Sequence, residues 1–211
     1  MSYKRPYETP EEKKAKDPPY YEMGSSVLKN KLGITNPQEA AEVETIGFIG
    51  AQVIFTKKLK KNTKFTEKYI QAIHRSALSY LYPFAGNYRD VNLSKAGHHF
   101  LPFSFIPRGM SYLEREFLSK IPADYEDAKK LIEDIAIIHC ELIHIHPFRE
   151  GNGRTARIFA DLMANRAGYP SLELNKFRNE NYPKYIKALN KGDEKNYKSM
   201  IEIIGNLFPA S

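Results

Sequence analysis

Residues 146–157 read His-Pro-Phe-Arg-Glu-Gly-Asn-Gly-Arg-Thr-Ala-Arg and lie between two segments with helical periodicity. In the preceding segment, residues 126–145, apolar side chains recur every three or four positions, which is the pattern of an amphipathic helix. Pro147 should end that helix, because proline lacks a backbone N–H and restricts the residue before it. A second apolar stripe follows and stops at Gly168, so the sequence predicts a helix, a loop and a helix.

The glycines and arginines of this loop predict an anion-binding site. Gly151, Asn152 and Gly153 would lie at the start of the second helix, where backbone N–H groups lack intrahelical acceptors and the helix dipole is positive. Glycines also let the backbone approach a ligand closely, which suits a phosphate group. Arg154 and Arg157 lie one helical turn apart and would add two guanidinium groups to the same anion.

Two neighbouring side chains add chemistry to this anion site. Glu150 is a hard oxygen ligand beside the phosphates, as nucleotide-bound Mg²⁺ requires. His146 can accept a proton near neutral pH. A Gly-Asn-Gly run is also common in simple turns, an Arg-x-x-Arg pair in solvated faces and a single histidine in protein cores. Their combination in one short loop between two helices favours the functional interpretation.

The run resembles the signature of the Fic (filamentation induced by cAMP) family, His-Pro-Phe-x-[Asp/Glu]-Gly-Asn-Gly-Arg-x-x-Arg, at every position. Family members with this signature transfer AMP from ATP to a hydroxyl group of a target protein and release pyrophosphate. The resemblance therefore implies a protein adenylyltransferase, a nucleotidyltransferase that uses ATP and Mg²⁺. Transfer of another nucleotide or phosphate-containing group stays open as the alternative. Gly153 favours AMP transfer. In the Doc branch, which transfers phosphate instead, a lysine takes the place of this glycine.

The resemblance also implies a role for each motif residue. His146 would deprotonate the target hydroxyl, Phe148 would pack the loop on the core, and Glu150 would hold Mg²⁺ against the phosphates. The remaining motif residues would bind the nucleotide phosphates: Gly151, Asn152, Gly153, Arg154 and Arg157.

The rest of the chain predicts a mainly α fold, and the resemblance makes this a Fic-like helical bundle with a small β-hairpin flap next to the active site. Helix starts are predicted at Asn36-Pro37, with an end near Ile54, and at Thr66. Further helices are expected over residues 109–119, 179–189 and 194–207. The segment Pro83-Phe84-Ala85-Gly86 also resembles the family, in which tryptophan usually replaces Phe84.

The flap is expected within residues 90–107, with strands at 91–93 and 100–106 around a turn at 94–97. By resemblance it would hold the target by main-chain pairing, with Phe100, Leu101 and Phe103 as target-binding residues. An ordinary surface hairpin is the alternative. Near the C-terminus, Tyr182, Tyr185 and Asn190 resemble the adenine-proximal segment, since a tyrosine can stack on a base and an amide can read its edge. Helix packing and a turn at 190–193 are the alternatives for these residues.

Composition limits the class of protein. The chain has 211 residues with a net charge of +7 and one cysteine, so it suits one domain without an internal disulfide. Residues 1–20 resemble a flexible arm, and residues 21–211 a single Fic domain. No membrane span or signal peptide is visible, so a cytoplasmic location is expected. The lysines are scattered, and no direct nucleic-acid binding is expected.

Regulation is inferred from a pattern that is missing. Many Fic proteins carry an inhibitory [Ser/Thr]-x-x-x-Glu-[Gly/Asn] helix, and no match is found here. The resemblance of residues 21–35 to the lead-in of antitoxin-paired toxins suggests a toxin restrained by a small separate antitoxin, whose glutamate would pair with Arg157. DNA gyrase or topoisomerase IV is a candidate target by analogy alone.

Overall fold

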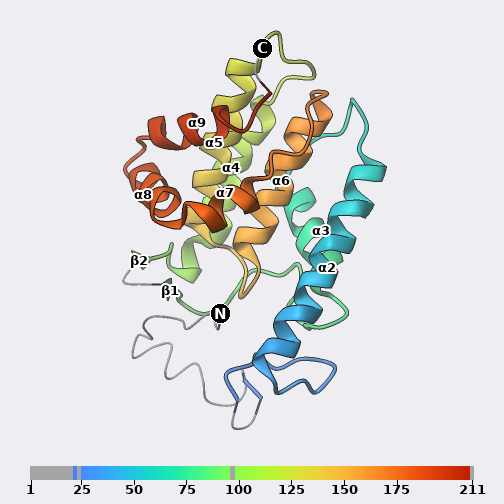
Figure 1. Ribbon diagram of the computed structural model, residues 1–211. Helices are drawn as coiled ribbons and strands as arrows, with labels where there is room; N and C mark the ends of the chain where they lie inside the picture. The colour runs from blue at the N-terminus through green and yellow to red at the C-terminus, as the bar shows by residue number, and fades with distance from the viewer. Residues whose placement is uncertain (1–20, 23–24, 96–97, 210–211) are drawn as a thin grey trace.

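The computed structural model describes residues 21–22, 25–95 and 98–209, and this part of the chain is mainly helical (Figure 1). The arm expected over residues 1–20 lies outside the described residues. The α-helices are α2 (Pro37–Lys58), α3 (Glu67–Leu78), α4 (Ile106–Glu116), α5 (Ala128–Ile145), α6 (Asn152–Arg166), α7 (Leu174–Glu180), α8 (Tyr182–Asp193) and α9 (Lys198–Gly205). Two 3₁₀ turns, η1 (Phe103–Phe105) and η2 (Leu118–Lys120), flank α4, and β1 (Ser94–Lys95) pairs with β2 (His98–His99).

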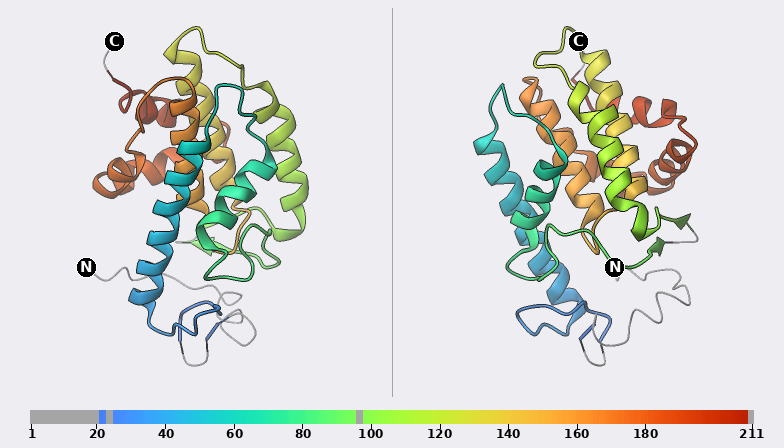
Figure 2. Two further views of the ribbon diagram at one scale, coloured as in Figure 1. Left: turned by 90° about the vertical axis from the view of Figure 1, so that its right-hand side faces the viewer. Right: turned by 180° about the vertical axis from the view of Figure 1, so that it is seen from behind.

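Helices α5 and α6 form the centre of the bundle and are joined by the motif loop (Figure 1). The pair α2 and α3 packs against α6, while α4, α8 and α9 pack against α5 (Figure 2). The two central helices contribute much of the core, including Leu131, Ile135, Phe159 and Met163. Within the described ranges, no helix is long and apolar enough to cross a bilayer.

The predicted capping residues begin the helices where expected. The Asn36 side chain accepts from the backbone N–H groups of Gln38 and Glu39, at 2.8 and 3.2 Å. Thr66 caps α3 by accepting from the N–H of Tyr69 at 3.1 Å. These side chains satisfy N–H groups that the first helical turn leaves without acceptors.

The predicted strand over residues 100–106 is wrong. The antiparallel pairs are Ser94 with His99 and Lys95 with His98, so β1 lies inside the expected turn at residues 94–97 and β2 directly follows it. The strand expected at residues 91–93 is not formed either. Residues 103–105 form η1 and α4 already begins at Ile106, with proline in its first turn. Prolines at 102 and 107 lack the N–H groups that a strand would need, and a proline is well accommodated in the first turn of a helix.

The C-terminal helices also differ from the prediction. The expected helix over 179–189 is divided at Asn181 between α7 and α8. Helix α8 continues to Asp193, so the turn expected at residues 190–193 is its last turn. Pro183 accounts for the division, because it suits the first turn of a new helix better than the interior of an existing one.

Candidate active site

His146 occupies a strained backbone position at the junction of α5 and the loop. It is the C-cap of α5 with a φ of 50° and a ψ of 58°, a left-handed conformation that is uncommon for residues other than glycine. Its N–H still donates to the carbonyl of Leu142 at 3.0 Å. Because Pro147 cannot continue the helix, the chain turns here and projects the imidazole from the helix end.

The surroundings of the His146 ring favour a neutral imidazole. Nδ1 lies 3.1 Å from the carbonyl oxygen of Ile143, which can only accept, so Nδ1 carries the hydrogen. Burial lowers the pKa of His146 to about 3. The other nitrogen, Nε2, therefore has a free lone pair at neutral pH. Phe100 stacks on the ring with centroids 3.6 Å apart and an interplanar angle of 15°.

The loop after His146 is braced from inside the core. Phe148 is fully buried and stacks on His74, with ring centroids 3.9 Å apart. The Asn152 side chain accepts from the Phe148 N–H at 2.8 Å and donates to the Phe148 carbonyl at 2.7 Å. Since these bonds fix the Asn152 side chain against Phe148, the backbone N–H of Asn152 is the group at the start of α6.

Buried His74 holds the far side of the same loop. Its Nδ1 accepts from the N–H of Gly86 at 2.8 Å, so its Nε2–H donates to the carbonyl of Glu150 at 2.9 Å. Burial lowers the pKa of His74 to about 4, which agrees with this neutral state. The site prediction did not include His74. The feature of the sequence that could have identified it is a histidine on the apolar face of α3, between Ile73 and Ala77.

Gly151 is the N-cap of α6 and occupies a position that disfavours any residue with a Cβ. Its φ is 79°, and a Cβ built on it would lie 2.7 Å from Cζ of Phe48. The Gly151 N–H donates to Oε1 of Glu150 at 2.9 Å. The N–H groups that follow belong to the first turn of α6 and lie at the positive end of the helix dipole, as the predicted anion site requires.

Arg154 is held by two carboxylates and an aromatic ring. It forms an ion pair with Glu44 of α2, lies 3.5 Å from Oε1 of Glu150, and sits 4.5 Å above the ring of Phe48. Glu44 also accepts from the Tyr82 hydroxyl at 2.6 Å. Sequence analysis did not identify Glu44, although it is a buried acid on the face that α2 shares with Phe48. The guanidinium is therefore positioned before any phosphate binds.

Arg157 lies one turn further along α6 beside Tyr185. Burial and nearby positive charge lower its pKa, while Tyr185 partly offsets this effect. The Tyr185 hydroxyl also shares a 2.7 Å hydrogen bond with Nε2 of His139. Burial raises the pKa of Tyr185 to about 12 and lowers that of His139 to about 3, so both groups are neutral.

The three residues expected near adenine all lie on α8 and differ in exposure. Tyr185 is only 3% exposed and contacts Arg157. Tyr182 is 36% exposed at the other end of α8's first turn, with the Arg178 guanidinium 5.1 Å from its ring. Asn190 is exposed within α8.

The flap residues are connected to the motif by Arg89, which the site prediction also left out. Arg89 is 4% exposed, and its guanidinium donates to the carbonyls of His146 at 2.7 Å, Leu101 at 2.5 Å and Ile145 at 3.3 Å. Leu101 N–H also donates to the His144 carbonyl at 3.3 Å. Phe103 lies in η1 with 42% of its surface exposed. In the sequence, the indication that Arg89 belongs to the site was its position three residues after the family-like segment Pro83-Phe84-Ala85-Gly86.

Glu150 suits a Mg²⁺ ion that is shared with a nucleotide. No group of three potential metal-ligating side chains occurs among the described residues, so the protein forms no closed metal cage there. Mg²⁺ commonly takes one or two carboxylates, with phosphates and water completing its octahedron. The partly exposed Glu150 carboxylate at the α6 N-terminus provides that kind of donor.

Known proteins resemble the chain in both sequence and fold. Residues 64–164 match the model of the Fic/DOC family. A relative from Drosophila willistoni, "Protein adenylyltransferase Fic", is 28% identical over 168 residues, covering 80% of this chain and 33% of the relative. The chain thus spans about a third of the length of that relative.

Two crystal structures from Bartonella share the architecture and confirm the predicted fold. One is the N-terminal Fic domain of a VirB-translocated Bep effector from Bartonella quintana, with a TM-score of 0.75, 24% identity and coverage of 90% of this chain and 91% of that one. The other is BepC from Bartonella tribocorum with bound AMPPNP, with a TM-score of 0.73, 22% identity and coverage of 91% and 97%. Residues 64–164 thus match the Fic/DOC family, and the described part of the chain has the fold of Fic domain structures.

Proposed function

We propose that the protein is a Mg²⁺-dependent protein adenylyltransferase that moves AMP from ATP to a serine, threonine or tyrosine hydroxyl of a target protein. The observation that carries this proposal is the state of His146. Its Nδ1–H is committed to the Ile143 carbonyl, so Nε2 can accept a proton next to the anion-binding start of α6. The name of the Drosophila relative and the AMPPNP bound to BepC support the choice of ATP.

In the proposed reaction, the target hydroxyl oxygen attacks the α-phosphorus of ATP while Nε2 of His146 takes its proton. A new P–O bond forms to the target, the bond to the β-phosphate breaks, and pyrophosphate leaves. The N–H groups of Gly151, Asn152 and Gly153, with Arg154 and Arg157, hold the phosphates and stabilise the developing charge. Bound through Glu150, Mg²⁺ would neutralise phosphate charge.

Label transfer tests this assignment. Purified protein is incubated with a bacterial lysate and either α-labelled or γ-labelled ATP, with and without Mg²⁺. We expect label from the α position alone, and only with Mg²⁺. His146→Ala should abolish transfer and keep the ATP-induced rise in melting temperature, whereas Arg157→Ala should lose both. Label from the γ position, or unchanged transfer by His146→Ala, would refute the proposal. Competition with UTP and GTP separates the alternative of another nucleotide.

We further propose that the protein acts in the cytoplasm as a toxin and that a separate antitoxin inhibits it. Glu44 pairs with Arg154 rather than Arg157, which leaves the second arginine for the glutamate of a partner. DNA gyrase or topoisomerase IV remains a target proposed by analogy. Expression of the chain alone in bacteria should arrest growth, and His146→Ala should relieve the arrest. Harmless expression of a wild-type protein that is active in vitro would contradict the toxin role.

A further inference from the structure

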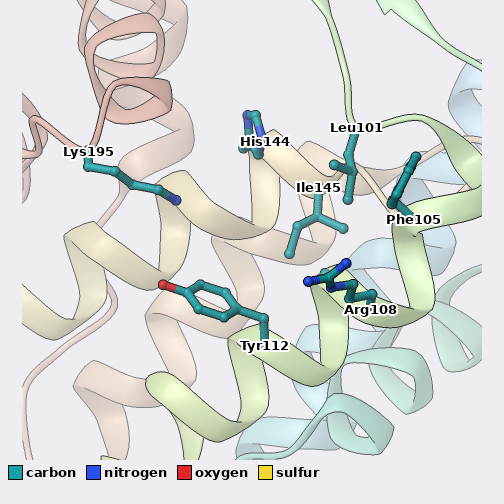
Figure 3. Close-up of a pocket in the computed structure, with 8 residues that line it drawn as sticks. Leu101, Phe105, Arg108, Tyr112, His144, Ile145 and Lys195 are labelled. Carbon is teal, nitrogen blue, oxygen red and sulfur yellow. The ribbon is translucent and has the colours of Figure 1, made fainter.

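A pocket lies beside the motif, and its lining includes none of the residues proposed to bind phosphate. It is a pocket of about 290 Å³ between the start of α4, the end of α5 and the segment after α8 (Figure 3). Its volume is at the lower end of the range for small-molecule sites, so it suits one large side chain better than a nucleotide.

Two residues that line the pocket are direct neighbours, along the chain, of residues in the proposed active site. Leu101, which lines it, follows Phe100, the residue stacked on the His146 ring. Ile145, which also lines it, directly precedes His146. A polypeptide bound across the flap would therefore need to extend by only a few residues to reach the pocket.

The lining combines apolar surface with one uncommitted positive charge. Leu101 and Ile145 provide aliphatic surface, and Phe105 and Tyr112 are 51% and 39% exposed. Arg108 is exposed and, within the described part of the chain, makes no ion pair or hydrogen bond. Figure 3 shows its side chain extending among the other labelled residues.

Lys195, the other cation of the pocket, is already neutralised. Its Nζ lies 2.7 Å from each carboxylate oxygen of Glu141. His144 is likewise engaged, with Nδ1 2.8 Å from Oδ1 of Asp193. Arg108 is thus the cation at this pocket that is available to a ligand, and the net charge of +7 favours an acidic partner overall.

We propose that this pocket is a docking site for the target protein, distinct from the site of the modified hydroxyl. It receives a bulky apolar side chain from an acidic segment of the target, and a neighbouring carboxylate pairs with Arg108. Such a partly exposed aromatic and arginine surface is typical of sites that recognise peptides. The inference rests on the proposed function, because the flap and His146 define where the target lies.

Methyl-labelled NMR tests the docking site without knowledge of the target. The probe is the peptide acetyl-Asp-Glu-Phe-Glu-Asp-amide, titrated into the full chain. We expect shifts at the methyl groups of Leu101 and Ile145, and about a tenfold weaker Kd for Arg108→Glu, equivalent to about 1.4 kcal/mol. The control is Lys176→Glu, which lies on α7 outside the pocket and changes the net charge by the same amount. It should leave the Kd unchanged.

Three results would overturn the docking site: no shift at millimolar peptide, equal Kd values for Arg108→Glu and wild type, or equal binding of a peptide with alanine in place of phenylalanine. A concentration-dependent dimer that Arg108→Glu dissolves would assign the surface to a second copy instead and would also overturn it.

Label transfer separates this inference from the proposed function. Arg108→Glu should lower transfer from α-labelled ATP to the target at least about tenfold at limiting target, with the ATP-induced rise in melting temperature unchanged. If wild type transfers no label, the proposed function fails, and the peptide titration still decides whether the pocket binds acidic segments. If Arg108→Glu transfers label as well as wild type does, the docking site fails while the adenylyltransferase assignment stands.

Discussion

Protonation of His74 should destabilise the protein in mild acid. Its Nδ1 accepts from Gly86 and its Nε2–H donates to Glu150, so a second ring proton would break the bond with Gly86. The native pKa is about 4, below the ordinary value of 6.5. The unfolded state therefore binds more protons between these values. The stabilisation is complete above pH 6.5 and is lost as the pH falls toward 4.

The size of the effect follows from the two pKa values. Lowering the pH from 7 to 5 should cost about 2 kcal/mol through His74. His139 is 2% exposed and has a pKa of about 3, so it should add a similar loss. His146, with a pKa of about 3, adds a third loss of this size. The total of about 6 kcal/mol is a large part of the 5–15 kcal/mol that stabilises a typical domain.

Urea denaturation at pH 7 and pH 5 measures this loss for wild type, His74→Gln and His99→Gln. Glutamine can donate and accept in place of His74 but does not titrate, so His74→Gln should lose about 2 kcal/mol less than wild type over this range. His99 is exposed, so His99→Gln serves as the matched control. Parallel pH profiles for wild type and His74→Gln would refute the assignment of a neutral, bridging His74.

Other contacts make further predictions. Arg89→Met should lower the free energy of unfolding by about 3 kcal/mol, because buried carbonyls lose charge-assisted donors, whereas the exposed Arg115→Met should change it by less than about 1 kcal/mol in the same urea titration. Gly151→Ala should destabilise more than Gly168→Ala: both glycines have positive φ, but only at Gly151 would a Cβ meet a neighbouring ring, and equal midpoints would contradict this. Glu150→Gln, or removal of Mg²⁺ with EDTA, should reduce the ATP-induced rise in melting temperature, and an unchanged rise would exclude Glu150 as the Mg²⁺ ligand.

The sequence was sufficient to predict the features that depend on neighbouring residues. Asn36 and Thr66 mark helix starts, because each cap bonds to N–H groups two or three residues away. Pro147 and Gly151 mark the ends of the two central helices for equally local reasons. The motif loop could thus be placed at the start of a helix, and its resemblance to the Fic signature led to the correct fold.

Local pattern was misleading where prolines and aromatic residues mix. Residues 100–106 have the composition of a strand, yet Pro102 deprives this segment of a ladder donor, and most of it forms η1 and the start of α4. The division at Asn181 between α7 and α8 was missed for a similar reason, because a proline that starts one helix can look like an irregularity within a longer one.

Only the tertiary structure brought together the residues that hold the site in place. Glu44, His74 and Arg89 are distant from the motif in sequence but contact Arg154, the Glu150 carbonyl and the His146 carbonyl. In the sequence each was one polar residue near apolar neighbours, and its partner could not be named, because such pairings depend on which helix faces pack together. Short-range hydrogen bonding sets helix ends from sequence alone, whereas long-range packing decides the charge, tautomer and orientation of the groups between them.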